Sequence, residues 1–250
     1  MTHPLLAFSD GGFHFTRGVF PYSAGVAALP GWAIERVRFR RVLPMAEGFA
    51  AIAAHLQRLG RPLTALCACE LRSPAQFSDE QFAVFNAGYV QTLQAWGLFR
   101  DGVNPVARSN LVPMVQPPAS AGFHAFSYTV PATQGLAGFV IAGSGEVPEG
   151  RPNYRDHIVA KGDTSPAGLQ QKVQWVLGEQ GRRLAALGRT WDDVTATQIY
   201  TEHDVLPLVA GELRARGATG GDIVWHPIRP PIVDLDFEMD CRGIALERVI

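Results

Sequence analysis

The sequence predicts an α+β protein of two tandem domains, each a mixed β-sheet with two helices packed on one face. Three observations lead to this prediction: an internal repeat, amphipathic helices around each copy of it, and extended segments that close each copy. The repeat starts at Leu59 in LGRPLTALCACEL and at Leu187 in LGRTWDDVTATQIY, an offset of 128 residues (187 minus 59) without a gap. A repeat of this length indicates two copies of one folding unit.

Helices are expected on both sides of each repeated strand. Residues 49–59 and 165–187 carry apolar side chains at helical spacing before the first and second copy. After the first copy, Ser78 and Gln81 have the spacing of a capping box. Residues 203–217 form the corresponding helix after the second copy. Each half therefore has the order helix, strand, helix.

Two extended segments close each half: SNLVPMV and FHAFSYTV in the first, DIVWHP and IVDLDFEMDC in the second. Alternation of polar and apolar residues in such segments predicts strands with one buried face. The short, Pro- and Gly-containing stretch TVPATQGLAG joins the halves. We therefore expect an N-terminal domain at 1–132 and a C-terminal domain at 135–250, each with its helices on one side of a sheet.

Composition excludes several classes of protein. The chain has 250 residues, 47% hydrophobic and 18% charged, which is typical of a globular protein. We expect no membrane partner, because no run of 18 apolar residues occurs. A net charge of −1 disfavours nucleic acid, and the seven histidines lack metal-ligand spacing. Three cysteines are too few for a disulfide framework, and the start of the sequence does not read as a secretory signal, so a cytoplasmic location is expected.

Several short motifs, in order and at consistent spacing, resemble the Rid family (also called YjgF) of enamine and imine deaminases. They are PYSAGV at 21–26, FAVFNAGY at 82–89, NPVARSNLVP at 104–113, GFVIAGSGEVPEG at 138–150 and the closing VDLDFEMDC. The resemblance covers most of the chain and implies two tandem domains of chorismate-mutase-like fold. It implies no cofactor and no metal.

The resemblance also implies the residues of a site for a small anionic substrate. Arg108, in the family's P-A-R-S strand, is expected to clamp a substrate carboxylate, with Ser109 beside it. Arginine suits this role because its planar guanidinium binds a carboxylate through two parallel hydrogen bonds. Tyr22 and Tyr89 are the expected substrate-binding tyrosines, Tyr22 being contributed by an adjacent domain. Packing in the core is the alternative for both tyrosines, and an ion pair is the alternative for the arginine.

The two halves differ where the family carries a catalytic glutamate. The first half has His124 there, whereas the second has Asp236 and Glu238 but no arginine near Asp222. We therefore expect one kind of site per chain, marked by Arg108. Either His124 or one of the two acids orients the attacking water and transfers a proton. A hydrogen-bonded strand histidine and a solvated strand face are the structural alternatives.

The predicted function is hydrolysis of an enamine or imine carboxylate, of the 2-aminomuconate type found in nitroaromatic or aminophenol breakdown, to a keto acid and ammonia. A chorismatase-like hydrolase of a carboxylate-bearing ring is the alternative enzyme, and a non-catalytic ligand-binding module is the alternative outside enzymes. An apolar sheet face without helices must be covered, and Rid proteins cover it by trimerising. We therefore expect a homotrimer with sites at domain or subunit interfaces.

Overall fold

The structure, a computed structural model, describes residues 4–132 and 136–250. Its strands are β1 (Leu5–Phe8), β2 (Phe13–Thr16), β3 (Gly25–Ala28), β4 (Trp32–Pro44), β5 (Leu66–Arg72), β6 (Ala107–Pro113), β7 (Gly122–Pro131), β8 (Phe139–Gly145), β9 (Ala196–Thr201), β10 (Asp222–Arg229), β11 (Glu238–Gly243) and β12 (Leu246–Val249). Among the described residues these twelve strands form one sheet, ordered β1-β2-β3-β8-β11-β9-β10-β6-β5-β7-β4-β12. The pairs β5–β6 and β9–β10 are parallel and the remaining long pairs are mostly antiparallel, so the sheet is mixed.

Four α-helices occupy the described ranges: α1 (Met45–Arg58), α2 (Asp79–Ala95), α3 (Pro166–Ala186) and α4 (Leu206–Ala215). Ser78 and Gln81 form the predicted capping box of α2. Ser165 caps α3, which starts with Pro166 as predicted. The order helix, strand, helix, strand, strand therefore occurs in both halves, and the predicted α+β class is confirmed.

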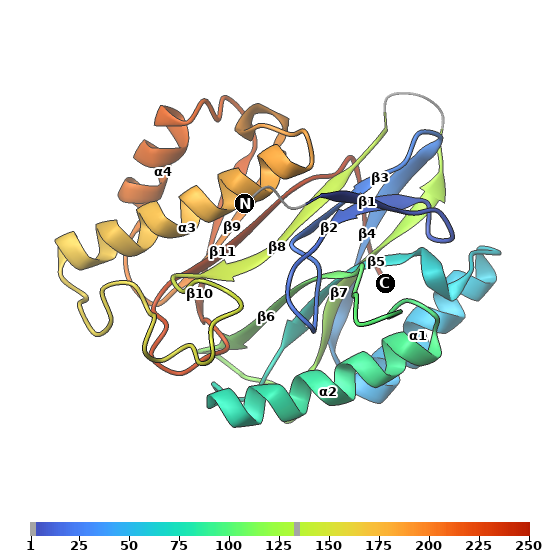
Figure 1. Cartoon of the computed structure of the whole chain (residues 1–250), viewed down its shortest axis with the longest axis horizontal. Coiled ribbons are helices and arrows are strands. Elements are labelled where there is room, and N and C mark those ends of the chain that lie inside the picture. Colours follow the sequence, from blue (N-terminus) through green and yellow to red (C-terminus); the bar gives the residue numbers. More distant parts are fainter. Residues whose placement is uncertain (1–3, 133–135) are drawn as a thin grey trace.

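Each half has two helices on one side of its part of the sheet. Figure 1 shows α1 and α2 on one outer side of the molecule and α3 and α4 on the other, with the strands between them. In the first half, Ile52 and Leu93 pack with Phe126 of β7. In the second half, Val176 and Val209 belong to the cluster that covers β9 and β11. Burial of these side chains fixes both helix pairs, because each fully buried large apolar residue contributes about 1.5–3 kcal/mol.

A third apolar cluster joins the two halves inside one chain. It includes Phe13, Cys67 and Ala107 of the first half and Ala142 and Ile244 of the second. Apolar strand surface of each half is therefore covered by the other half. The sequence argument for a trimer assumed that another chain must supply this cover.

Strands cross the expected boundary in both directions. The N-terminal strands β1 to β3 join the sheet through β8 of the second half, and C-terminal β12 pairs with β4 of the first. The expected limits at 132 and 135 thus divide the sequence. In the sheet, however, each half contributes strands that pair with strands of the other half. Residues 133–135 of the junction lie outside the described residues.

One predicted strand is shorter than expected. The segment IVDLDFEMDC becomes regular only at Glu238, where β11 begins, so Asp236 precedes the strand. Asp236 and Glu238 consequently do not lie on one face of a strand, as the alternation of polar and apolar residues predicts. No α-helix in the described ranges is long and apolar enough to span a lipid bilayer.

Candidate active site

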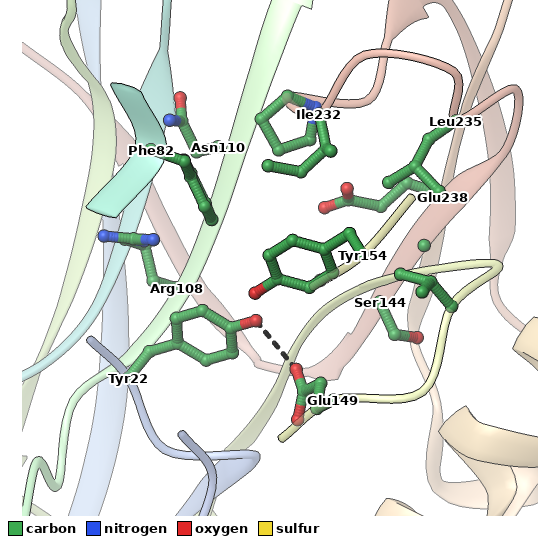
Figure 2. A pocket seen from close by; sticks show the side chains of 14 residues that line it. Tyr22, Phe82, Arg108, Asn110, Ser144, Glu149, Tyr154, Ile232, Leu235 and Glu238 are labelled. Carbon is green, nitrogen blue, oxygen red and sulfur yellow. Dashed lines mark hydrogen bonds between the residues drawn. The ribbon is translucent and has the colours of Figure 1, made fainter. Parts of the chain in front are cut away.

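A pocket lies between the two halves and contains the arginine singled out from the sequence. Figure 2 shows its lining side chains around a common space. These side chains come from the loop before β3, from α2, from β6, from the end of β8, from the start of β11, and from the segments that follow β8 and precede β11. The lining residues are Tyr22, Phe82, Arg108, Asn110, Gly143, Ser144, Gly145, Val147, Glu149, Tyr154, Pro231, Ile232, Leu235 and Glu238. The site is therefore built from both halves of one chain.

Arg108 is a buried cation without a carboxylate partner among the described residues. Its Nη2 donates to Oδ1 of Asn86 at 2.7 Å, and its Nη1 has no hydrogen-bond partner in the ranges that the structure describes. The guanidinium carbon lies 5.1 Å from the ring of Tyr22 and 4.9 Å from that of Tyr89. Burying an uncompensated charge is costly, although aromatic faces offset part of the cost. This arrangement suits a guanidinium that receives an anionic ligand.

Tyr22 and Glu149 form a polar wall of the same pocket. The hydroxyl of Tyr22 donates to Oε1 of Glu149 at 2.7 Å, as Figure 2 shows. The same Oε1 of Glu149 pairs with Nη2 of the fully buried Arg183 at 2.9 Å. Burial and the neighbouring Glu149 charge raise the pKa of Tyr22 well above its usual range. Tyr22 therefore stays a neutral phenol.

Glu238 is the buried carboxyl group of the pocket. Burial raises its pKa well above the usual range, and the nearby carboxyl groups of Asp240 and Glu146 raise it further. Gly143 leaves room for this side chain, because a Cβ at that position would collide with Oε1 of Glu238. Such surroundings favour the protonated acid over the carboxylate, and a protonated acid can donate a proton.

A buried ion cluster holds the chain just before Glu238. Glu146 accepts hydrogen bonds from the backbone N–H groups of Asp236 at 2.6 Å and Phe237 at 3.0 Å. Lys172, also fully buried, lies 3.4 Å from Glu146 and 3.0 Å from Asp236. Asp236, a secondary candidate from the sequence, thus lies outside the pocket lining and serves this cluster.

Ser109 and Tyr89 are near the site but do not line the pocket. Alternation along β6 turns Ser109 away from Arg108, and its hydroxyl donates to Asp240. Tyr89 is buried in the core of the first half beneath the guanidinium of Arg108. Ser109 and Tyr89 therefore pack behind the residues that line the pocket.

The structure does not place His124 in this pocket. Burial and the nearby cation of Arg72 together lower the pKa of His124 to about 3. The strand register shows which residue of the first half stands at the position of Glu238. Glu238 pairs with Tyr200, which lies 128 residues after Arg72, and Arg72 pairs with Gly122. The counterpart of Glu238 in the first half is therefore Gly122, and His124 is the residue of β7 that the pairing with β5 passes over.

We accordingly expect His124→Ala to keep turnover within a fewfold of wild type. A histidine that lies away from the pocket does not reach a ligand there and so cannot exchange a proton with it. Steady-state kinetics at neutral pH measure this. A loss of roughly a hundredfold, the scale of a removed general acid or base, would restore His124 to the site.

The second half has no equivalent arginine. Arg108 pairs with Cys69 in β5, and the residue 128 positions after Cys69, Thr197, pairs with Ile223. Isoleucine thus stands at the arginine position, where it packs against the core of the second half. The expectation that Arg108 marks one kind of site agrees with this register.

Three residues at the site were not predicted from the sequence. Asn86 lies inside the FAVFNAGY motif, and its signal was a polar residue on the buried face of a helix. Glu149 and Tyr154 belong to the irregular segment after β8, where periodicity gives no signal. Within the described ranges, no group of three His, Cys, Asp or Glu side chains is arranged to hold a metal ion.

Comparison with known proteins gives the family. Residues 5–248 match the family model described as 2-aminomuconate deaminase CnbZ. The chain belongs to this family. It is also 48% identical, over 98% of both chains, to a 2-amino-5-chloromuconate deaminase of Comamonas testosteroni. The prediction of an aminomuconate-type deaminase, made from the Rid-like motifs, is confirmed at the family level.

Two solved structures align with this chain. A chorismatase aligns over 94% of this chain and 78% of its own, with a TM-score of 0.54 and 14% identity, which shows a shared fold and nothing of activity. The YjgF gene product of E. coli aligns over 46% of this chain and 84% of its own, with 16% identity and a TM-score of 0.31.

Proposed function

We propose that the pocket between the halves hydrolyses an enamine dicarboxylate of the 2-aminomuconate type to the corresponding keto acid and ammonia. The observation that carries the proposal is the pairing, in one pocket, of a buried arginine that lacks a carboxylate partner with a buried glutamic acid of raised pKa. Membership of the 2-aminomuconate deaminase family supports this substrate class.

Arg108 binds the carboxylate next to the carbon that bears nitrogen. Nη1 is unpartnered among the described residues and Nη2 is held by Asn86, so the fork is already oriented before a ligand arrives. Fixing the carboxylate fixes the adjacent carbon and nitrogen, and such positioning accounts for a large part of catalysis.

Glu238 moves the protons of the reaction. Its carboxylic acid gives a proton to the carbon chain of the enamine while the nitrogen lone pair forms C=N. The resulting carboxylate of Glu238 takes a proton from a water molecule. At the same time the water oxygen bonds to the carbon of the C=N group, and one C=N electron pair returns to nitrogen. Glu238 then protonates the nitrogen, which leaves as ammonia with the C–N electron pair, and recovers the hydroxyl proton as the ketone forms. The cycle consumes one water and restores the neutral acid.

Product analysis tests this function. Purified protein incubated with 2-aminomuconate is expected to release ammonia and the keto acid in equal amounts. The chorismatase-like alternative predicts pyruvate from chorismate, which is measured in a parallel reaction. Binding of 2-aminomuconate without release of either product would leave only the ligand-binding alternative.

We keep the homotrimer as a prediction about assembly. Its support is now the exposed part of β10, where Val224 and Trp225 are each 38% exposed. Multi-angle light scattering at micromolar concentration is expected to give three times the mass of one chain. A monomer would mean that the contacts between halves suffice to cover the sheet.

We also place the protein in the cytoplasm. All three cysteines are free and buried, which suits a reducing compartment.

A further inference from the structure

The two halves differ most in the connection after their first long strand. In the first half β4 ends at Pro44 and α1 begins at the next residue. In the second half, residues 146–165 lie between β8 and α3. This inserted segment places Val147, Glu149 and Tyr154 in the lining of the pocket.

Contacts at three points hold the inserted segment over the site. The backbone N–H of Val159 donates to the carbonyl of Glu146 at 2.8 Å, which closes the segment on itself. The backbone N–H of Tyr154 reaches Oδ2 of Asp79, at the start of α2, at 3.3 Å. Lys161 pairs with Asp234 at 3.0 Å. Tyr154 is thus tied directly to the helix that also supplies Phe82 and Asn86.

Tyr154 presents an unused hydroxyl to the pocket. Its ring packs edge-on against Phe82 with centroids 6.3 Å apart, and no hydrogen bond among the described residues uses its hydroxyl. In Figure 2 the hydroxyl points toward the side of the pocket that holds Arg108 and Tyr22. Burial and the charge of Glu149 raise the pKa of Tyr154 to about 12, so the phenol is neutral.

The other two tyrosines near Arg108 differ from Tyr154 in their surroundings. The hydroxyl of Tyr22 already donates to Glu149. The hydroxyl of Tyr89 is buried in the core and absent from the pocket lining. Tyr154 is therefore the phenol of this trio that both lines the pocket and lacks a hydrogen-bond partner among the described residues.

We propose that Tyr154 is a further catalytic residue, whose phenol oxygen accepts a hydrogen bond from the nitrogen of the bound substrate. This inference rests on the proposed function. With the carboxylate on Arg108, the nitrogen is attached to the neighbouring carbon, in the space that the Tyr154 hydroxyl faces. Positive charge develops on nitrogen as the enamine becomes an iminium, and hydrogen bonds from charged donors are roughly twice as strong as neutral ones. The contact with Tyr154 therefore strengthens along the reaction, which is the condition for lowering its barrier.

Tyr154→Phe tests the proposal, because the ring and its packing on Phe82 are kept. Its kcat with 2-aminomuconate is expected to fall roughly ten- to a hundredfold, the loss that corresponds to one hydrogen bond with a charged group. Tyr128→Phe, which removes a hydroxyl that donates to Glu35 outside the pocket, is the matched control and is expected to retain wild-type kcat. Unchanged kcat in Tyr154→Phe would overturn the proposal.

Ligand titration separates this inference from the proposed function. Adipate and 2-aminoadipate share one six-carbon dicarboxylate chain and differ in the amino group, and neither reacts. Calorimetry is expected to show that Tyr154→Phe weakens 2-aminoadipate severalfold and leaves adipate unchanged. Equal weakening of both ligands, or of neither, overturns the role of Tyr154. A wild-type protein that binds both ligands but never releases ammonia would instead overturn the proposed function and leave the binding result standing.

Discussion

Arg108→Lys is expected to lose turnover by roughly a hundredfold or more while the protein stays folded, and Arg108→Ala is expected to lose more. A lysine keeps the charge but cannot reproduce two parallel hydrogen bonds to one carboxylate, and misplacing the reacting carbon by about 1 Å can cost about a hundredfold. The guanidinium has no ion-pair partner among the described residues, so its replacement breaks no salt bridge there. Steady-state kinetics and a thermal melt of each variant measure the two parts of this expectation.

Arg72→Lys is the matched control for that experiment. Arg72 is also a buried strand arginine, but it does not line the pocket. Its lysine variant is expected to turn over substrate within a fewfold of wild type. A similar loss in both variants would show that strand arginines act through the stability of the sheet.

Glu238→Gln is expected to lower turnover by roughly a hundred- to ten-thousandfold, the range typical of general acid–base catalysis. Glutamine has the shape of the neutral carboxylic acid, so the buried site stays packed while the transferable proton is lost. Glu212→Gln, the same change on α4 and outside this pocket, is the control and is expected to retain activity. Activity of Glu238→Gln within a fewfold of wild type would remove Glu238 from the mechanism.

The pH profile gives a second readout of Glu238. Its pKa is raised in the folded protein, and the proposed cycle starts from the protonated acid. Turnover in wild type is therefore expected to be present below the raised pKa and to decline as pH rises through it. The residual activity of Glu238→Gln is expected to lack this decline.

Local signals in the sequence predicted the order of elements correctly, because helix caps and apolar periodicity depend on neighbouring residues. Ser78 with Gln81 and Ser165 with Pro166 begin helices as expected. The exchange of β1–β3 and β12 between the halves could not be predicted in this way. Pairing of strands far apart in the sequence is decided by tertiary packing, on which local pattern carries no information.

The same limit explains which site residues were found. Arg108, Tyr22 and Glu238 carry recognisable motifs and meet in the pocket. The structure has Gly122, and not His124, at the register position of Glu238, and His124 does not line the pocket. Tyr154 went unnoticed because it lies in an inserted segment that the first half does not have.

Titration of adipate, which is not a substrate, into wild type and Arg108→Lys tests the central claim most directly. If the buried guanidinium is the carboxylate anchor, the variant binds adipate at least about tenfold more weakly, because one of two charge-assisted hydrogen bonds is lost. Equal affinities in the two proteins would show that Arg108 holds something other than the substrate carboxylate, and the account of this pocket as a deaminase site would be contradicted.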